Sequence, residues 1–263
     1  MRVLDRLLRK LSELILQVLA VTYVVLDGQF GNINALQVVR QIGSLQLISK
    51  LRYDAALHLR YDGPYGGRGP CRKYGDKITY HHIPGKYLRK TTIESGIRTD
   101  IYQAVALHAC FAQPLNVVIM VKTNLQTQAS AHVILFSSDL DLPYDKLIAY
   151  YRLRFQIEFN FRDAKQYWGL EDFMNVNQTP VTNAVNLSFL MVNLSHCLLR
   201  DFRHNHPEAG ALDLKTFFRG RRYVAEVIKS LAEKPDAILI QHVFDKVARI
   251  GAIHQAQPCS GSQ

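Results

Sequence analysis

The sequence predicts an α/β fold that is interrupted by a β-rich segment and followed by helices. Three observations predict this class. A short apolar run, Tyr23 to Leu26, follows an amphipathic helical pattern near the N-terminus. Between residues 78 and 138, apolar strand-like runs alternate with turn-forming residues. Beyond residue 143, the apolar residues recur at helical spacing instead.

The first predicted elements are a helix over residues 4–20 and the strand at Tyr23 to Leu26. The apolar residues with amphipathic helical spacing are Leu4, Leu7, Leu8, Leu11, Leu14 and Ile15. Positive charge precedes an apolar run here, as in a signal peptide, but Asp5 and Glu13 interrupt that run and argue against one. A turn at Asp27-Gly28 ends the strand. Asp27 is therefore expected at the carboxyl end of a buried strand, where α/β sheets place their chemistry.

Residues 60–77 are rich in glycine, cations and tyrosine, and they predict a flexible loop. This loop could follow a DNA backbone, and a solvated linker is the alternative. The strands predicted next are ITYHHI from Ile78, the run from Val105 to Phe111, LNVVIMVKT from Leu115 and HVILFSS from His132. Asp141 and Pro143 open a helix. Further helices are expected near residues 182–202, 213–232 and 236–249, with a disordered tail from His254.

The composition indicates a polyanionic partner. The 263 residues include 32 Lys and Arg against 22 Asp and Glu, which gives a formal charge of +10 and a pI near 9.5. This balance is typical of nucleic-acid-binding proteins, and a merely soluble basic protein is the alternative. The four cysteines lie far apart and no apolar segment is long enough to cross a bilayer, so we expect a cytoplasmic, DNA-associated protein. No P-loop, G-x-G-x-x-G or G-x-S-x-G motif indicates nucleotide binding or serine hydrolysis.

The stretch YYRLRFQIEFNFRDAKQYWGL, residues 150–170, predicts one amphipathic helix. At about 100° per residue, one face is apolar and is expected to lie against a core. The residues of this apolar face are Tyr150, Leu153, Ile157, Phe161, Ala164 and Trp168. Tyr151, Arg154, Glu158 and Lys165 converge along one border of it, within roughly 60° of one another.

Glu158 has two interpretations. Arg154 lies four residues before it and Arg162 four residues after it, so simple ion pairing along the helix is one of them. The other is that Glu158 is one ligand of a divalent cation, while Tyr151, Arg154 and Lys165 hold a phosphate backbone across it. Catalysis of phosphoryl transfer is largely positioning and charge stabilisation, which the flanking cations would supply.

The spacing Tyr151-x2-Arg154-x3-Glu158-x6-Lys165 resembles the Y-x2-R-x3-E-x6-K signature of bacterial cut-and-paste transposases of the insertion-sequence-four type. These are DDE transposases with a ribonuclease-H-like fold. Upstream, the run from Val24 to Phe30 resembles the strand that carries the second aspartate of that family. The β-rich segment resembles the insertion between its second and third acids. The resemblance covers about residues 4–200.

The resemblance implies a two-metal site in which Mg²⁺ or Mn²⁺ activates water, and then a DNA 3′ hydroxyl, for attack on phosphodiester bonds. It makes Asp27 and Glu158 the catalytic residues and metal ligands. It makes the contacts to transposon-end DNA Tyr151, Arg154, Arg162 and Lys165. The implied partners are double-stranded DNA of the transposon ends and the target, together with a second copy or a complementing N-terminal chain.

The family needs a first aspartate on the opening strand of the sheet, and none is credible here. Asp5 would lie in the first turn of a helix, where it favours the helix dipole. Asp139 and Asp141 follow a predicted strand, but capping the next helix is their expected role. We therefore expect a ribonuclease-H-like domain that lacks its first strands, the C-terminal part of a transposase that is inactive alone. A non-catalytic DNA-binding transposase remnant is the alternative, and a reading frame that never folds is a weaker one.

Four segments are predicted along the chain. Residues 1–50 would form the first part of the catalytic core, with the helix and the second-aspartate strand. Residues 51–130 would form the basic loop and the β insertion. Residues 131–205 would form the second part of the core, and residues 206–263 the C-terminal helices and tail.

Overall fold

The computed structural model describes residues 6, 9, 10, 18–42, 45–65, 67, 69–233 and 235–254. The chain divides into two compact units, Met1–Phe155 and Gln156–Gln263, called unit 1 and unit 2 below. Most of the helix predicted over residues 4–20, with Asp5 and Glu13, lies outside the described residues. The same holds for all but the first residue of the predicted disordered tail. The division into four segments stays a prediction.

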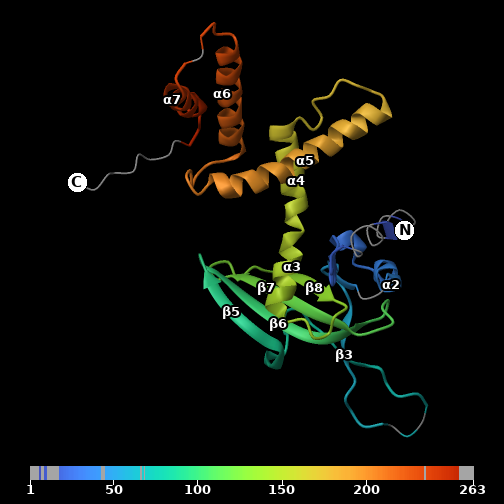
Figure 1. Ribbon diagram of the computed structural model, residues 1–263. Coiled ribbons are helices and arrows are strands. Elements are labelled where there is room, and N and C mark those ends of the chain that lie inside the picture. The colour runs from blue at the N-terminus through green and yellow to red at the C-terminus, as the bar shows by residue number, and fades with distance from the viewer. Residues whose placement is uncertain are drawn as a thin grey trace. The chain divides into compact units, whose positions relative to one another are not determined.

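The described part of unit 1 is built on one mixed sheet of eight strands (Figure 1). The strands are β1 (Tyr23–Val25), β2 (Gln46–Lys50), β3 (Leu57–Arg60), β4 (Tyr74–Lys77), β5 (Leu88–Glu94), β6 (Ile97–His108), β7 (Leu115–Asn124) and β8 (Ser130–Ser137). Their order across the sheet is β1-β2-β8-β7-β6-β3-β4, and β5 also pairs with β6. β1 and β2 run parallel, and the other described pairs are antiparallel. This sheet confirms the predicted α/β class with a β-rich middle.

Two helices cover opposite faces of the sheet, each packed against its own core. They are α2 (Ile33–Gln41) and α3 (Tyr144–Leu153). Successive strand residues point to opposite faces, so Leu47 packs into the core on the α2 side and Ile48 into the core on the α3 side. Val117 and Val118 of β7 divide between the two cores in the same way. Burial on both faces is why the central strands read as continuous apolar runs.

The strand predictions succeed where the apolar runs are longest. LNVVIMVKT is β7, and HVILFSS is most of β8. The run from Val105 to Phe111 is only the end of β6, which begins at Ile97. The prediction of a strand at ITYHHI is wrong. Its backbone forms a turn in which His82 N–H donates to Thr79 O, and Ile78 is buried by packing into the core.

Unit 2 is helical. Its helices are α4 (Phe155–Trp168), α5 (Gln178–Phe202), α6 (Ala211–Lys229) and α7 (Ala237–Ala248). These bounds confirm the helices predicted beyond residue 182. Gly220 allows α6 and α7 to pack closely, because a Cβ there would lie 2.8 Å from the carbonyl oxygen of Val247. In the part of the chain that the structure describes, no helix is long and apolar enough to cross a membrane.

The single helix predicted over residues 150–170 is in fact two helices, with Arg154 between α3 and α4. Arg154 N–H donates to the carbonyl of Tyr151, three residues back, so the α-helical hydrogen-bond pattern is interrupted at this residue. The prediction was wrong because helical apolar spacing continues through the break and nothing in the sequence marks it.

The prediction that the apolar face lies against a core is wrong over its middle. Leu153, Ile157 and Phe161 are 59%, 56% and 47% exposed, whereas Ala164 is fully buried. The exposed residues lie on either side of Phe155, where unit 1 ends and unit 2 begins. Apolar periodicity alone does not tell which part of a helix packs against a core.

Candidate functional site

Asp27 lies directly beyond the carboxyl end of β1, as the sequence predicts. It is the N-cap of a short 3₁₀ helix, Gly28–Phe30, and its carbonyl oxygen accepts from Phe30 N–H at 2.8 Å. The same oxygen accepts from Ser49 Oγ on β2 at 3.0 Å. The backbone that carries the Asp27 carboxylate is therefore fixed from within its own turn and from the neighbouring strand.

Gly31 closes this turn against β2. A Cβ at Gly31 would lie 2.1 Å from the carbonyl oxygen of Lys50, which no side chain could occupy. Asn32 follows as the N-cap of α2, and its side chain accepts from the backbone N–H groups of Asn34 and Ala35, both at 3.1 Å. The tight turn and the capped helix together hold the chain that leaves Asp27.

Arg154 connects the end of α3 to Asp27. Its Nε lies 3.6 Å from Asp27 Oδ1, and its guanidinium lies 5.9 Å from the ring centroid of Tyr151 and 4.9 Å from that of Phe155. Burial raises the pKa of Tyr151, with a further rise from the charge of Asp27 and an opposing effect of Arg154. The structure thus brings together three of the predicted site residues, Asp27, Tyr151 and Arg154.

A contact that the sequence does not predict holds β1 to the turn after β8. Tyr23 Oη donates to Asp139 Oδ2 at 2.7 Å, and this hydrogen bond raises the pKa of Tyr23 to about 12. Asp139 Oδ1 accepts from the backbone N–H of Asp141 at 3.0 Å. The N-cap of α3 is Pro143, and no side chain caps the helix. The predicted capping role of Asp139 and Asp141 is therefore wrong, because the carboxylate of Asp139 is taken up by the Tyr23 hydroxyl and its own turn.

Asp139 contacts the beginning of β1, and Asp27 lies beyond the other end of the strand. Its partner Tyr23 begins the strand, four residues before Asp27. At the rise of an extended chain, four residues span about 13 Å. Asp139 therefore binds the residue that begins β1, whereas Asp27 follows the end of this strand.

The remaining predicted site residues lie on α4 in unit 2. Glu158 is exposed in the first turn of this helix. Arg162 Nη2 lies 2.9 Å from Asp163 Oδ1, and Lys165 Nζ lies 2.7 Å from Glu171 Oε1. Both cations are about half exposed. Glu171 is also exposed, so water screens its ion pair with Lys165, whereas Asp163 is only 17% exposed and its ion pair with Arg162 is screened less.

The donors of Asp27 and Glu158 suit a hard divalent cation, because carboxylate oxygens are the ligands that Mg²⁺ and Mn²⁺ prefer. They do not by themselves make a metal centre. Among the described residues, no three His, Cys, Asp or Glu side chains form a group that could hold a metal ion.

A family described as "Transposase DDE domain" matches residues 2–194. The chain belongs to this family. A search of curated proteins returned no match. Membership implies DNA transposition and DNA as a partner, and DDE transposases generally use divalent metal ions. The mixed sheet followed by helices agrees with a ribonuclease-H-like DDE domain. The match ends within α5, so α6 and α7 lie beyond it.

Proposed function

We propose that this chain is the C-terminal part of a cut-and-paste transposase of the insertion-sequence-four type. In this proposal Asp27 and Glu158 are two of the three acids that hold Mg²⁺ or Mn²⁺, and the substrates are the transposon ends and the target DNA. The ion pair between Arg154 and Asp27 carries the proposal. This ion pair joins the strand motif around Asp27 to the helix signature that includes Arg154. The two motifs are far apart in the sequence, and the family uses both at one site.

In the bound state, the divalent cation would polarise the scissile phosphate and activate the attacking oxygen. The residues of the chain would position the strand. Arg154 is poised for this because the Tyr151 and Phe155 rings fix its guanidinium, and a planar guanidinium grips phosphate oxygens bidentately. Its Nε also lies 3.6 Å from Asp27 Oδ1, which places the guanidinium beside the proposed metal ligand.

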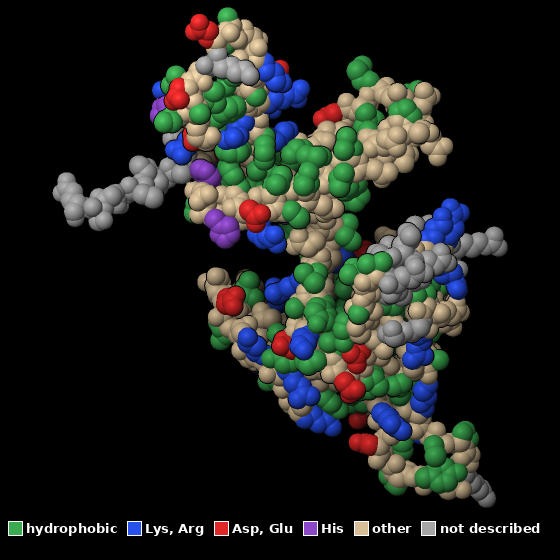
Figure 2. All heavy atoms as spheres, in the orientation of Figure 1, with side chains coloured by type: hydrophobic (Ala, Val, Ile, Leu, Met, Phe, Trp, Pro, Cys, Tyr) green, Lys and Arg blue, Asp and Glu red, His purple; other side chains and the backbone are tan. Residues whose placement is uncertain are grey.

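Arg162 and Lys165 would extend the DNA contact along α4. The Glu171 carboxylate beside Lys165 is 65% exposed, so a DNA phosphate could replace it at little cost, whereas the Asp163 partner of Arg162 is only 17% exposed. The wider surface supports the same partner, because Figure 2 shows Lys and Arg side chains spread over the visible face of unit 1. Summed over the chain, the charge of +10 attracts a polyanion and speeds its encounter.

The first acid is the part that we infer to be missing from these 263 residues. Among the described strands, β1 pairs with β2 alone, so its other edge can accept a further strand. A strand added there would end beside Asp27 if it ran parallel to β1. An aspartate on such a strand would complete the three acids.

The proposal can be tested by transposition of a marked element in bacteria. The chain would be expressed with the coding sequence that lies upstream of Met1, in frame or joined across one frameshift. We expect transposition with the extended chain, and a loss of at least about 100-fold in Asp27→Asn and in Glu158→Gln. Asp145→Asn, an exposed carboxylate in the first turn of α3, is the matched control and should transpose normally.

Transposition that persists in both Asp27→Asn and Glu158→Gln would contradict the assignment of the acids. Unrelated sequence or multiple stop codons upstream, with no transposition, would indicate a DNA-binding remnant instead of part of an active enzyme.

A further inference from the structure

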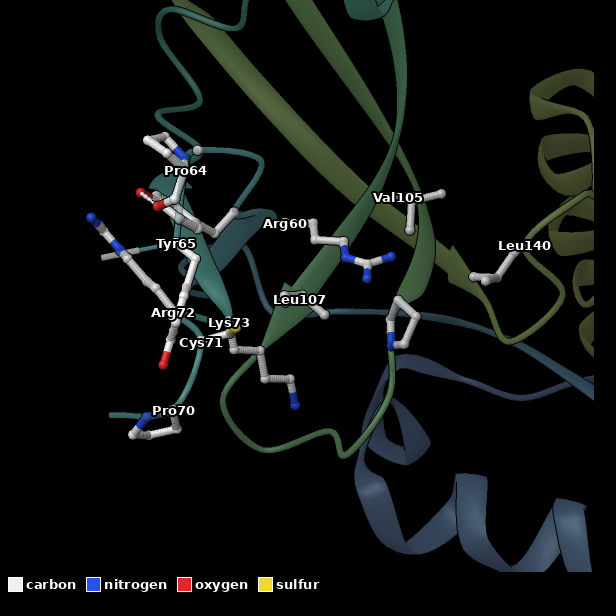
Figure 3. A pocket seen from close by; sticks show the side chains of 13 residues that line it. Arg60, Pro64, Tyr65, Pro70, Cys71, Arg72, Lys73, Val105, Leu107 and Leu140 are labelled. Atoms are coloured by element: carbon white, nitrogen blue, oxygen red, sulfur yellow. Dashed lines mark hydrogen bonds between the residues drawn. The ribbon is translucent and has the colours of Figure 1, made fainter. Parts of the chain in front are cut away.

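A cavity of about 880 Å³ opens on unit 1 at the base of the β3–β4 connection (Figure 3). Its walls come from the end of β3, the β3–β4 connection, β6 and the turn after β8. Neither Asp27 nor any residue of the helix signature lines it. The cavity is therefore a second candidate site, apart from the proposed acids.

Three cations line the cavity without a lining carboxylate. They are Arg60, Arg72 and Lys73, all exposed, and none of them forms an ion pair within the described part of the chain. Arg72 Nε donates to Tyr74 O at 2.8 Å, and Lys73 Nζ donates to Ala112 O at 3.4 Å. Each side chain keeps further N–H donors, so the cavity can bind an anion without breaking these bonds.

The cavity also presents flat apolar surfaces. Tyr65 is 60% exposed, and its hydroxyl donates to Gly69 O at 2.7 Å, which holds the ring in place. The guanidinium of Arg72 lies 5.1 Å from the ring centroid of Tyr61. Val105 and Leu140 line the cavity and are 46% and 40% exposed although they are large and apolar. A ligand with an aromatic ring could cover these surfaces and remove them from water.

We propose that this cavity binds one unpaired nucleotide of a DNA strand. The base would pack against Tyr65 and the apolar wall, and the phosphates would lie against Arg60, Arg72 and Lys73. An inorganic anion would use the cations and leave the apolar wall uncovered. A base inside a duplex is stacked on both faces and cannot enter, so the nucleotide must be single-stranded or turned out of the helix. The inference rests on the proposed function in one respect, which is that the bound strand is DNA.

The test is fluorescence anisotropy without divalent metal, so that it does not depend on catalysis. Two 3′-labelled 12-mers would be compared, oligo-dT and an abasic strand with the same phosphates. Aromatic stacking of a base contributes about 1–3 kcal/mol, so dT12 should bind at least about fivefold more tightly than the abasic strand. Tyr65→Leu should remove that preference, while Tyr53→Leu, which changes another exposed tyrosine outside the cavity, should keep it.

A second variant separates the phosphate contact from the base contact. Arg72→Gln should weaken the binding of dT12 and of the abasic strand by the same factor. It should also reduce the slope of log K against log salt by about 0.7. Arg89→Gln, an exposed cation on β5 that does not line the cavity, should leave the slope closer to that of the parent chain. These variants change exposed side chains, so their thermal unfolding should match that of the parent chain.

Equal binding of dT12 and the abasic strand, or an undiminished preference in Tyr65→Leu, would overturn the inference. Competition by free thymidine monophosphate as strong as that by dT12 would assign the cavity to mononucleotides and would also overturn it. The outcome is separable from that of the proposed function. Failed transposition with intact base-dependent binding would contradict the transposase proposal alone, and the reverse result would contradict this inference alone.

Discussion

Asp27 shows how much of the site follows from its local sequence. A β-branched apolar run that ends in Asp-Gly predicts a strand with the carboxylate at its end, and the structure has both. The partner of Asp27 follows less directly. The signature spacing singles out Arg154, but only the fold brings it within 3.6 Å of Asp27. The hydrogen bond between Tyr23 and Asp139 has no local signal, because it joins residues far apart in the sequence through the pairing of β2 with β8.

Gly31 offers a test of the turn that positions Asp27. Gly31→Ala should lower the free energy of unfolding by about 1–3 kcal/mol, because the added Cβ would meet the carbonyl oxygen of Lys50. Gly85→Ala is the control, since a Cβ there meets nothing within 4 Å. Urea unfolding followed by circular dichroism measures both. An equally stable Gly31→Ala would show that the turn has room to relax.

At the scale of secondary structure, burial decides which elements can be predicted. β7 and β8 are buried on both faces and give long apolar runs, which the sequence shows plainly. β5 is almost wholly exposed, and its sequence, LRKTTIE, has no apolar run to mark it. ITYHHI gives the opposite error, because side chains in an irregular segment can pack into a core as well as those in a strand. The break at Arg154 is invisible for a related reason, since it changes hydrogen bonds and leaves the spacing of apolar residues intact.

The start of α6 makes a prediction about pH. Burial raises the pKa of Asp213, but hydrogen bonds from Gly210 N–H and from His254 and Ile253 outweigh it and lower the pKa to about 2. A depressed carboxyl pKa stabilises the fold above the pKa of the unfolded chain, and this contribution is lost as the pH falls through the folded value. Unit 2 should therefore lose about 2 kcal/mol of stability between roughly pH 5 and pH 2 from this group.

Asp213→Asn should remove that contribution at pH 7 and should be no less stable than the parent chain near pH 2. Trp168 is the only tryptophan of the chain and lies in unit 2, so its fluorescence reports unfolding there. Asp201→Asn, an exposed carboxylate on α5, is the control and should change little at either pH. A parent chain whose unit 2 is equally stable at pH 7 and pH 2 would contradict the role of Asp213.

At the scale of the whole molecule, family membership and charge agree on DNA as the partner. Membership follows from the match over residues 2–194. Unit 1 carries Asp27 with Tyr151 and Arg154, and unit 2 carries Glu158 with Arg162 and Lys165. The sequence alone does not show this division, because its helical spacing runs across Phe155 without a break.

The most direct test of the central claim is the action of the purified 263-residue chain on a duplex that carries the terminal repeat bordering its gene. Binding and cleavage would be followed on one gel, with Mg²⁺ or Mn²⁺ and over a range of salt. We predict a retarded and uncut duplex, with affinity that falls steeply as salt rises, because in the proposed function the chain supplies phosphate contacts but only two of the three acids. Metal-dependent nicking that disappears in Glu158→Gln would contradict the inference that the chain lacks the first acid. A duplex that is not bound at low salt would contradict DNA as the partner.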